Sequence, residues 1–166
     1  MAEITRKELV LALVAAGEKP RLAGLDLSGL DLSHLDLHGA DLNGSDLSSC
    51  TLHKANLEGC NLRGANLTEA DCSGAHLHRA FLDEAVCFKT SFAHADLTHV
   101  DAPKAFFKEA DFTEANCAQL LLRGANLSGA VCLRTDFRGA NCGEATWDGA
   151  RIEACNFNGT LEAPPH

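Results

Sequence analysis

Cysteine and histidine offer the most varied chemistry in this chain of 166 residues, which contains eight of each. Thiolates bind zinc, form disulfides and act as nucleophiles, yet the sequence has no Cys-x-x-Cys pair. His38, Glu58 and His78 follow one another at intervals of twenty residues, as do His76 and Asp96. If the chain coils with that period, imidazoles and carboxylates come together as ligands for a divalent metal ion. Solvated side chains on an outer surface are the simpler interpretation.

A repeat of five residues positions all of these side chains. From Leu27 to Phe157 an apolar or small residue occupies every fifth position, twenty-seven times in succession. These central positions hold fourteen Leu, five Phe and five Cys, together with Ala102, Trp147 and Ile152. A second small or apolar residue, most often Ala, stands two positions before the centre, and the residue between them is Asp or Asn in seventeen repeats. The pattern predicts two inward and three outward positions in every repeat.

A period of five matches neither an α-helix nor a long flat strand, so each repeat must bend the chain once. Glycine ends eleven of the repeats, where a tight corner needs a permissive backbone. The Asp and Asn side chains are suited to hydrogen-bond the main-chain amides of these corners. The chain is therefore expected to coil into a solenoid, in which each coil packs on its neighbours.

Repeats such as Ala40-Asp41-Leu42-Asn43-Gly44 and Ala65-Asn66-Leu67-Thr68-Glu69 resemble the A(D/N)LXX consensus of pentapeptide repeat proteins. The resemblance covers residues 25–159. It implies an all-β solenoid, a right-handed quadrilateral β-helix with four repeats per coil, six to seven coils and a length of roughly 30 Å. Ala102 is expected to thin the core locally, and Trp147 to overfill it.

All eight cysteines occupy one of the two inward positions, five at centres and three two residues earlier. No two lie at equivalent positions one coil apart. The phase predicts that they are small core residues, with no disulfide or metal role. Eight unpaired thiols favour a reducing compartment, and hence a cytoplasmic location.

The segment before the repeats predicts a capping helix. Thr5 and Glu8 form a capping-box pattern, and Ile4 and Leu9 form a hydrophobic staple around it. The helix is expected to run to about Ala16, to stop at the following glycine and to cover the first coil, where Leu replaces the usual Ala. A cleaved signal peptide is the alternative interpretation, which the acidic residues near a short apolar run disfavour.

The sequence thus divides into a capping helix with its lead-in (1–24), a pentapeptide-repeat β-helix (25–159) and a C-terminal tail (160–166). No run of residues reaches the length of a membrane span, and no membrane association is expected.

No catalytic residue, cofactor site or bound cofactor is predicted, because a filled β-helix without insertions has no cleft in which reactive groups converge. The function expected is that of a structural scaffold that binds an unidentified protein. The family resemblance implies an alternative, since some members mimic duplex DNA and bind DNA gyrase. The net charge of −9 favours this alternative, whereas its even distribution over the four sides weighs against it. Direct nucleic-acid binding is not expected.

Several apolar residues occupy outward positions, and a contiguous cluster of such residues marks a contact surface. Stacking at twenty residues places Phe106 above Val86, with Phe88 beside them. The candidate interaction patch consists of Phe81, Val86, Phe88, Phe106 and Leu121; Val131 and Leu133 break the polar rule elsewhere. Two interpretations are open: a surface for a partner or for self-association, and local packing over a corner.

The C-terminal coil has large centres and only a short, Pro-rich segment after it. A bare coil end exposes strand edge and core side chains, so either those residues or a second molecule should close it. Proline cannot donate ladder hydrogen bonds, which disfavours continuous pairing there. A monomer or a weak homodimer is expected.

Overall fold

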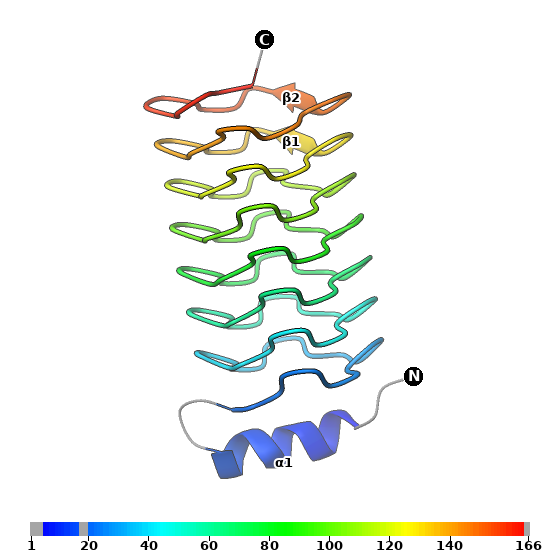
Figure 1. Ribbon diagram of the computed structural model, residues 1–166. Coiled ribbons are helices and arrows are strands. Elements are labelled where there is room, and N and C mark those ends of the chain that lie inside the picture. The colour runs from blue at the N-terminus through cyan, green and yellow to red at the C-terminus, as the bar shows by residue number, and fades with distance from the viewer. Residues whose placement is uncertain (1–4, 17–19, 165–166) are drawn as a thin grey trace.

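The computed structural model describes residues 5–16 and 20–164. A single helix, α1 (Arg6–Ala16), precedes a stack of square coils, in which β1 (Val131–Leu133) and β2 (Arg151–Glu153) are the only described strands of three residues. Everywhere else the coils pair through isolated parallel bridges between residues twenty positions apart, as at Arg21 and Asp41 or Asn141 and Leu161. Figure 1 shows these coils stacked along one axis, with α1 lying across the N-terminal end.

Hydrogen bonds explain why the period is twenty. From the second coil onward the residue before the centre donates its N–H to the coil below, as Asp41 does to the Pro20 carbonyl at 2.9 Å. The same residue accepts from the central N–H of that lower coil, as Asp41 does from Leu22 at 2.7 Å. Seven coils of twenty residues therefore connect Arg21 to Leu161 in one parallel ladder, which confirms the predicted solenoid.

The corners follow the predicted chemistry and extend it. Gly29 adopts a φ of 71°, in the left-handed region that glycine enters without strain. The same position of other repeats holds sixteen residues that are not glycine, including His34 at 60° and Lys54 at 53°. At many corners the preceding Asp or Asn fixes the turn, as Asp26 Oδ1 accepts from the Ser28 N–H at 2.9 Å.

Central side chains fill the interior of the coils. Phe92, Phe107, Phe112 and Phe137 are fully buried, and the rings of Phe92 and Phe112 stack at 5.4 Å between centroids. Ala102 is also fully buried. Because Phe107 and Phe112 follow it in the same coil, two large side chains accompany the small one. The inner space is therefore packed with side chains through the middle of the rod.

The N-terminal cap has the geometry that the sequence predicts. The Thr5 N–H donates to Glu8 Oε2 at 2.7 Å, and the Glu8 N–H donates to Thr5 Oγ1 at 3.3 Å. Leu9 is fully buried in the same cluster as the coil core, and Leu25, Leu30 and Leu35 pack against that cluster. The predicted staple residue Ile4 and the glycine after Ala16 lie outside the described residues. No helix in the described part of the chain is long and apolar enough to cross a membrane.

Candidate interaction surface

The five predicted patch residues all lie on the outside of the coils, on two neighbouring sides. Phe81, Val86 and Leu121 expose 36%, 38% and 43% of their surfaces, whereas Phe88 and Phe106 are half-buried. These values are high for large apolar side chains in a molecule whose other outward positions are mostly polar. The surface is therefore a candidate for contact with another molecule.

Three of the five residues are in direct proximity. Val86 and Phe106 are partners in a parallel bridge between successive coils, and the rings of Phe88 and Phe106 lie 6.5 Å apart between centroids at a tilt of 39°. The predicted stacking of Phe106 on Val86 is therefore confirmed. Val86, Phe88 and Phe106 together form the Phe106 patch.

Phe81 and Leu121 are arranged differently. They occupy one column of the ladder, but Asp101 lies between them and bridges to both. The Arg63 guanidinium carbon lies 4.3 Å from the centroid of the Phe81 ring, and Arg63 Nε lies 3.1 Å from Asp83 Oδ2. Phe81 is thus partly covered by a cation that a carboxylate holds in place, and Asp101 separates Phe81 from Leu121.

Asp101 is affected by this setting. Burial beside the two apolar side chains raises the pKa of Asp101 above its ordinary value, the nearby Asp83 carboxylate raises it further, and Arg63 opposes both. The sequence pattern did not single out Asp101, because at the corresponding position of other repeats an Asp is an ordinary corner residue.

Cations surround the Phe106 patch, and the pattern of apolar residues alone does not indicate them. Lys89 Nζ lies 5.1 Å from the centroid of the Phe88 ring and 3.8 Å from Glu109 Oε2. Lys104 and Lys108 are exposed and form no ion pair with any residue in the described part of the chain. The signal was present in the sequence, where lysines at 104 and 108 stand two residues on either side of Phe106.

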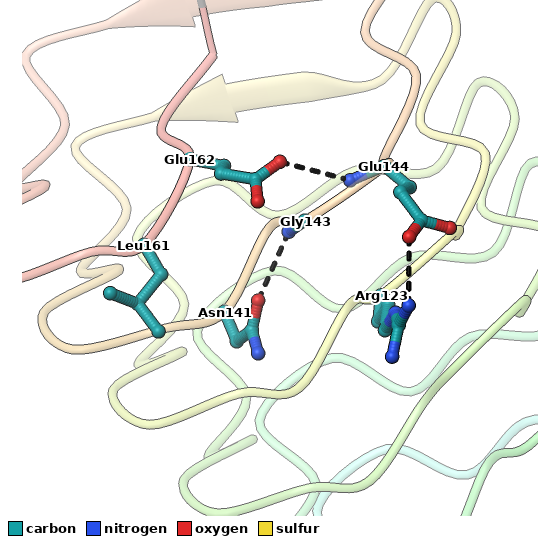
Figure 2. A pocket seen from close by; sticks show the side chains of 6 residues that line it. All are labelled: Arg123, Asn141, Gly143, Glu144, Leu161 and Glu162. Atoms are coloured by element: carbon teal, nitrogen blue, oxygen red, sulfur yellow. Dashed lines mark hydrogen bonds and ion pairs between the residues drawn. The ribbon is translucent and has the colours of Figure 1, made fainter.

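Two hollows of the described surface lie elsewhere, toward the C-terminal end. Figure 2 shows one of about 300 Å³, where Arg123 donates to Glu144 Oε1 at 2.8 Å and the Glu144 N–H donates to Glu162 Oε2 at 3.4 Å. The remaining lining residues are Asn141, Gly143 and Leu161. Arg123 is satisfied by Glu144, which raises the pKa of Arg123. The hollow therefore contains an internal ion pair, and none of its lining residues is a Ser, Cys or His.

The cysteines are core residues, as their phase predicts. Seven are buried, and only Cys155 in the last coil is half-buried. Burial raises the pKa of the Cys50 thiol to about 11 and that of Cys60 to about 12. Cys50 donates its thiol hydrogen to the Leu27 carbonyl of the coil below at 2.9 Å, and Thr90 donates to Leu67 in the same way at 2.7 Å. At this position the thiol acts as a hydrogen-bond donor between coils.

The histidine columns lie on the surface as expected, but their contacts are local. His78 Nδ1 is 2.7 Å from Thr98 Oγ1, and its ring lies 5.5 Å from that of His99. Within residues 5–16 and 20–164, no three His, Cys, Asp or Glu side chains form a group that is suited to hold a metal ion. The predicted set of His38, Glu58 and His78 does not converge into such a group.

These coils define the class of the protein as a β-helical repeat protein, and the sequence comparison identifies the family. The profile of the pentapeptide repeats matches eight copies, over residues 20–48, 45–83, 90–129 and 116–152. The chain belongs to the pentapeptide repeat family. No curated protein sequence matches it.

One solved structure agrees with this fold, and two others are similar with lower TM-scores. A superposition on QnrB1, a plasmid-mediated fluoroquinolone resistance protein, has a TM-score of 0.53 at 17% identity and covers 87% of this chain and 76% of QnrB1. HetL, which is involved in heterocyst differentiation regulation in the cyanobacterium Nostoc sp. strain PCC 7120, is 20% identical, with a TM-score of 0.31 over 96% of this chain and 95% of HetL. The alr5209 protein of Nostoc is 32% identical over 64% of this chain and 80% of its own, with a TM-score of 0.41. At 17% identity the likeness to QnrB1 shows the fold alone.

Proposed function

We propose that this chain is a non-enzymatic scaffold that binds a protein partner through the Phe106 patch. The observation that supports the proposal is the direct proximity of three outward apolar side chains, Val86, Phe88 and Phe106, on two successive coils. Local packing alone would account for a single covered side chain, but it does not account for Val86, which keeps 38% of its surface in solvent.

The packing of the molecule supports a non-catalytic role. The coil interior is filled with side chains, and the cysteine thiols, which are the strongest nucleophiles of the chain, are mostly buried with raised pKa values. A general acid or base must converge with other groups around a bound substrate. The hollow at Arg123 offers an internal ion pair instead. The reduced, buried cysteines also favour a cytoplasmic location.

Affinity capture from cells that produce the protein tests the proposal. Phe88→Asp places a carboxylate within the patch and should abolish capture of the specific partner. Leu133→Asp is the matched control, because Leu133 is a half-buried apolar residue directly after a central residue, on another side of the coil. Capture that is equal for wild type and Phe88→Asp, or lost equally in both variants, would contradict a role of the patch.

A second candidate function is DNA mimicry directed at DNA gyrase, which the net charge of −9 favours. Two features weigh against DNA mimicry: the negative charge is evenly distributed over the four sides of the coil, and unpaired lysines lie beside Phe106. A mimic of phosphate rows should instead concentrate negative charge on one surface. A supercoiling assay decides: inhibition of gyrase by the protein at stoichiometric concentration would favour mimicry over the scaffold.

A further inference from the structure

The surface around Phe106 differs in charge from the rest of the molecule. Lys104 and Lys108 flank Phe106 in sequence, and both are exposed. Neither forms an ion pair with any residue in the described ranges, although the chain as a whole has a net charge of −9. An unpaired ammonium on each side of an apolar side chain is a local departure from an acidic background.

Neighbouring coils leave this positive charge largely uncompensated. Glu109 is engaged by Lys89 at 3.8 Å, and the repeat that stacks above Phe106 presents the uncharged Asn126 and Ser128. Glu84 lies one coil below Lys104 in the repeat order, but the two side chains do not form an ion pair. The Phe106 patch thus combines an apolar centre with two lysines whose charges remain available.

We propose that the Phe106 patch binds a polypeptide segment in which an apolar side chain is flanked by aspartate or glutamate residues. This inference rests on the proposed scaffold function and specifies its partner. The apolar side chain would contact Phe88 and Phe106, and the carboxylates would reach Lys104 and Lys108. Complementary charge selects the correct partner and accelerates encounter.

Size and charge favour a peptide segment over other partners. Val86 and Phe106 occupy adjacent coils, about 5 Å apart at ladder spacing, so the apolar centre accommodates one or two side chains. That area is much smaller than a standard interface between folded domains. Nucleic acid and anionic membranes carry many closely spaced negative charges, which two lysines on a chain of net charge −9 do not offset, whereas a segment with one or two carboxylates matches these lysines.

Selection from a library of random dodecapeptides against the full-length protein provides the test. The enriched peptides should share an apolar residue with Asp or Glu within a few positions of it. The tightest peptide is then titrated by fluorescence anisotropy at low and high salt. Lys104→Glu with Lys108→Glu should weaken its binding by about tenfold or more at low salt, and by less at high salt because of screening.

Lys54→Glu with Arg79→Glu is the matched control. Lys54 and Arg79 are exposed, lie on the other two sides, and form no ion pair with described residues. Lys54, Arg79 and Lys104 also share the positive-φ corner position, at 53°, 56° and 56°. The control changes net charge by the same amount, so it should alter binding by less than about twofold at low salt if the effect is local.

Three results would overturn the inference. They are enrichment of basic or uncharged peptides, equal weakening of peptide binding by the two double variants, and peptide binding that is unchanged in Lys104→Glu with Lys108→Glu. If binding of such peptides is still abolished by Phe88→Asp, the scaffold proposal remains while the acidic partner is rejected. If Phe88→Asp and Leu133→Asp captured the specific partner equally well, the scaffold proposal itself would be rejected. Self-association lost in Phe106→Ser would replace the peptide by a second copy of this chain.

Discussion

The two ends of the β-helix are closed in different ways. At the N-terminal end, α1 buries Leu9 against the core, and Arg6 donates to the main-chain carbonyls of Asp31 and Ser33, the latter at 3.2 Å. Arg6 also forms an ion pair with the Asp31 carboxylate at 3.2 Å. A whole helix therefore seals the first coil (Figure 1).

The C-terminal end has a smaller closure. The Cys142 N–H donates to the Leu161 carbonyl at 2.9 Å, and Thr160 Oγ1 donates to the Phe137 carbonyl at 2.7 Å. Trp147 and Phe157 remain half-buried, and their N–H groups make no main-chain hydrogen bond within the described residues. One end of this solenoid is thus covered by a helix, whereas the described part of the other end is closed only by a short tail segment, in which Pro164 is buried.

Removal of residues 1–19 should have the largest effect. It deletes α1 while keeping Pro20, whose carbonyl accepts from Asp41. The first coil would expose its strand edge and Leu25, Leu30 and Leu35, so we expect aggregation or loss of cooperative unfolding. Size-exclusion chromatography and urea unfolding measure both. A truncated protein that is monomeric and as stable as the full chain would show that α1 is not a cap.

Cysteine in the last coil should react with a thiol reagent much faster than the cysteines of the interior. Cys155 is half-buried in the last coil and should react first with a thiol reagent, whereas buried Cys60, with its pKa raised to about 12, should react only on unfolding. Mass spectrometry of time points identifies each labelled residue. Rapid labelling of three or more cysteines in the folded protein would show that the inward phase is wrong.

Leu9→Ala should destabilise the protein by about 2–4 kcal/mol, because it removes buried methyl groups and leaves a cavity under α1. Leu11→Ala is the control on the same helix, where Leu11 exposes 61% of its surface. It should change stability by only about 0.5 kcal/mol or less. The midpoint of urea unfolding reports both values, and equal losses would mean that α1 does not pack through Leu9.

Self-association should be the weakest effect, giving a monomer or a weak homodimer in light scattering across a concentration series. Any association should use an uncovered apolar surface. A dimer that survives Phe88→Asp and dissociates in Trp147→Ala would place the contact at the C-terminal end. Association that persists in both variants, or that requires the surface of α1, would contradict the contrast between the two ends.

The regular parts of this structure were predictable because one rule repeats. The inward phase of the central residues, the capping box of Thr5 and Glu8 and the stacking of Phe106 on Val86 all follow from local chemistry and a period of twenty. The square cross-section came from the family resemblance, since the repeat of five alone does not fix four repeats per coil.

Three features did not follow from the pattern. Periodicity gives the direction of a side chain and not its conformation, so the stacking of Arg63 on Phe81 was missed. Corners occupied by His34 or Lys54 adopt the same positive φ as those with glycine, because hydrogen bonds to a neighbouring coil hold it, as the His34 N–H donates to the His53 carbonyl at 3.0 Å. Cys155 is inward by phase yet half-buried, because no further repeat is paired above its coil among the described residues.

Photo-crosslinking in living cells tests the central claim most directly. Benzoylphenylalanine in place of Phe88 puts the reactive group inside the Phe106 patch, and the same residue in place of Leu133 provides the control on another side. We predict a covalent adduct with a second, specific protein at position 88 and none at position 133. Absence of an adduct at position 88, or equal adducts at both positions, would contradict the role of the patch as the binding surface.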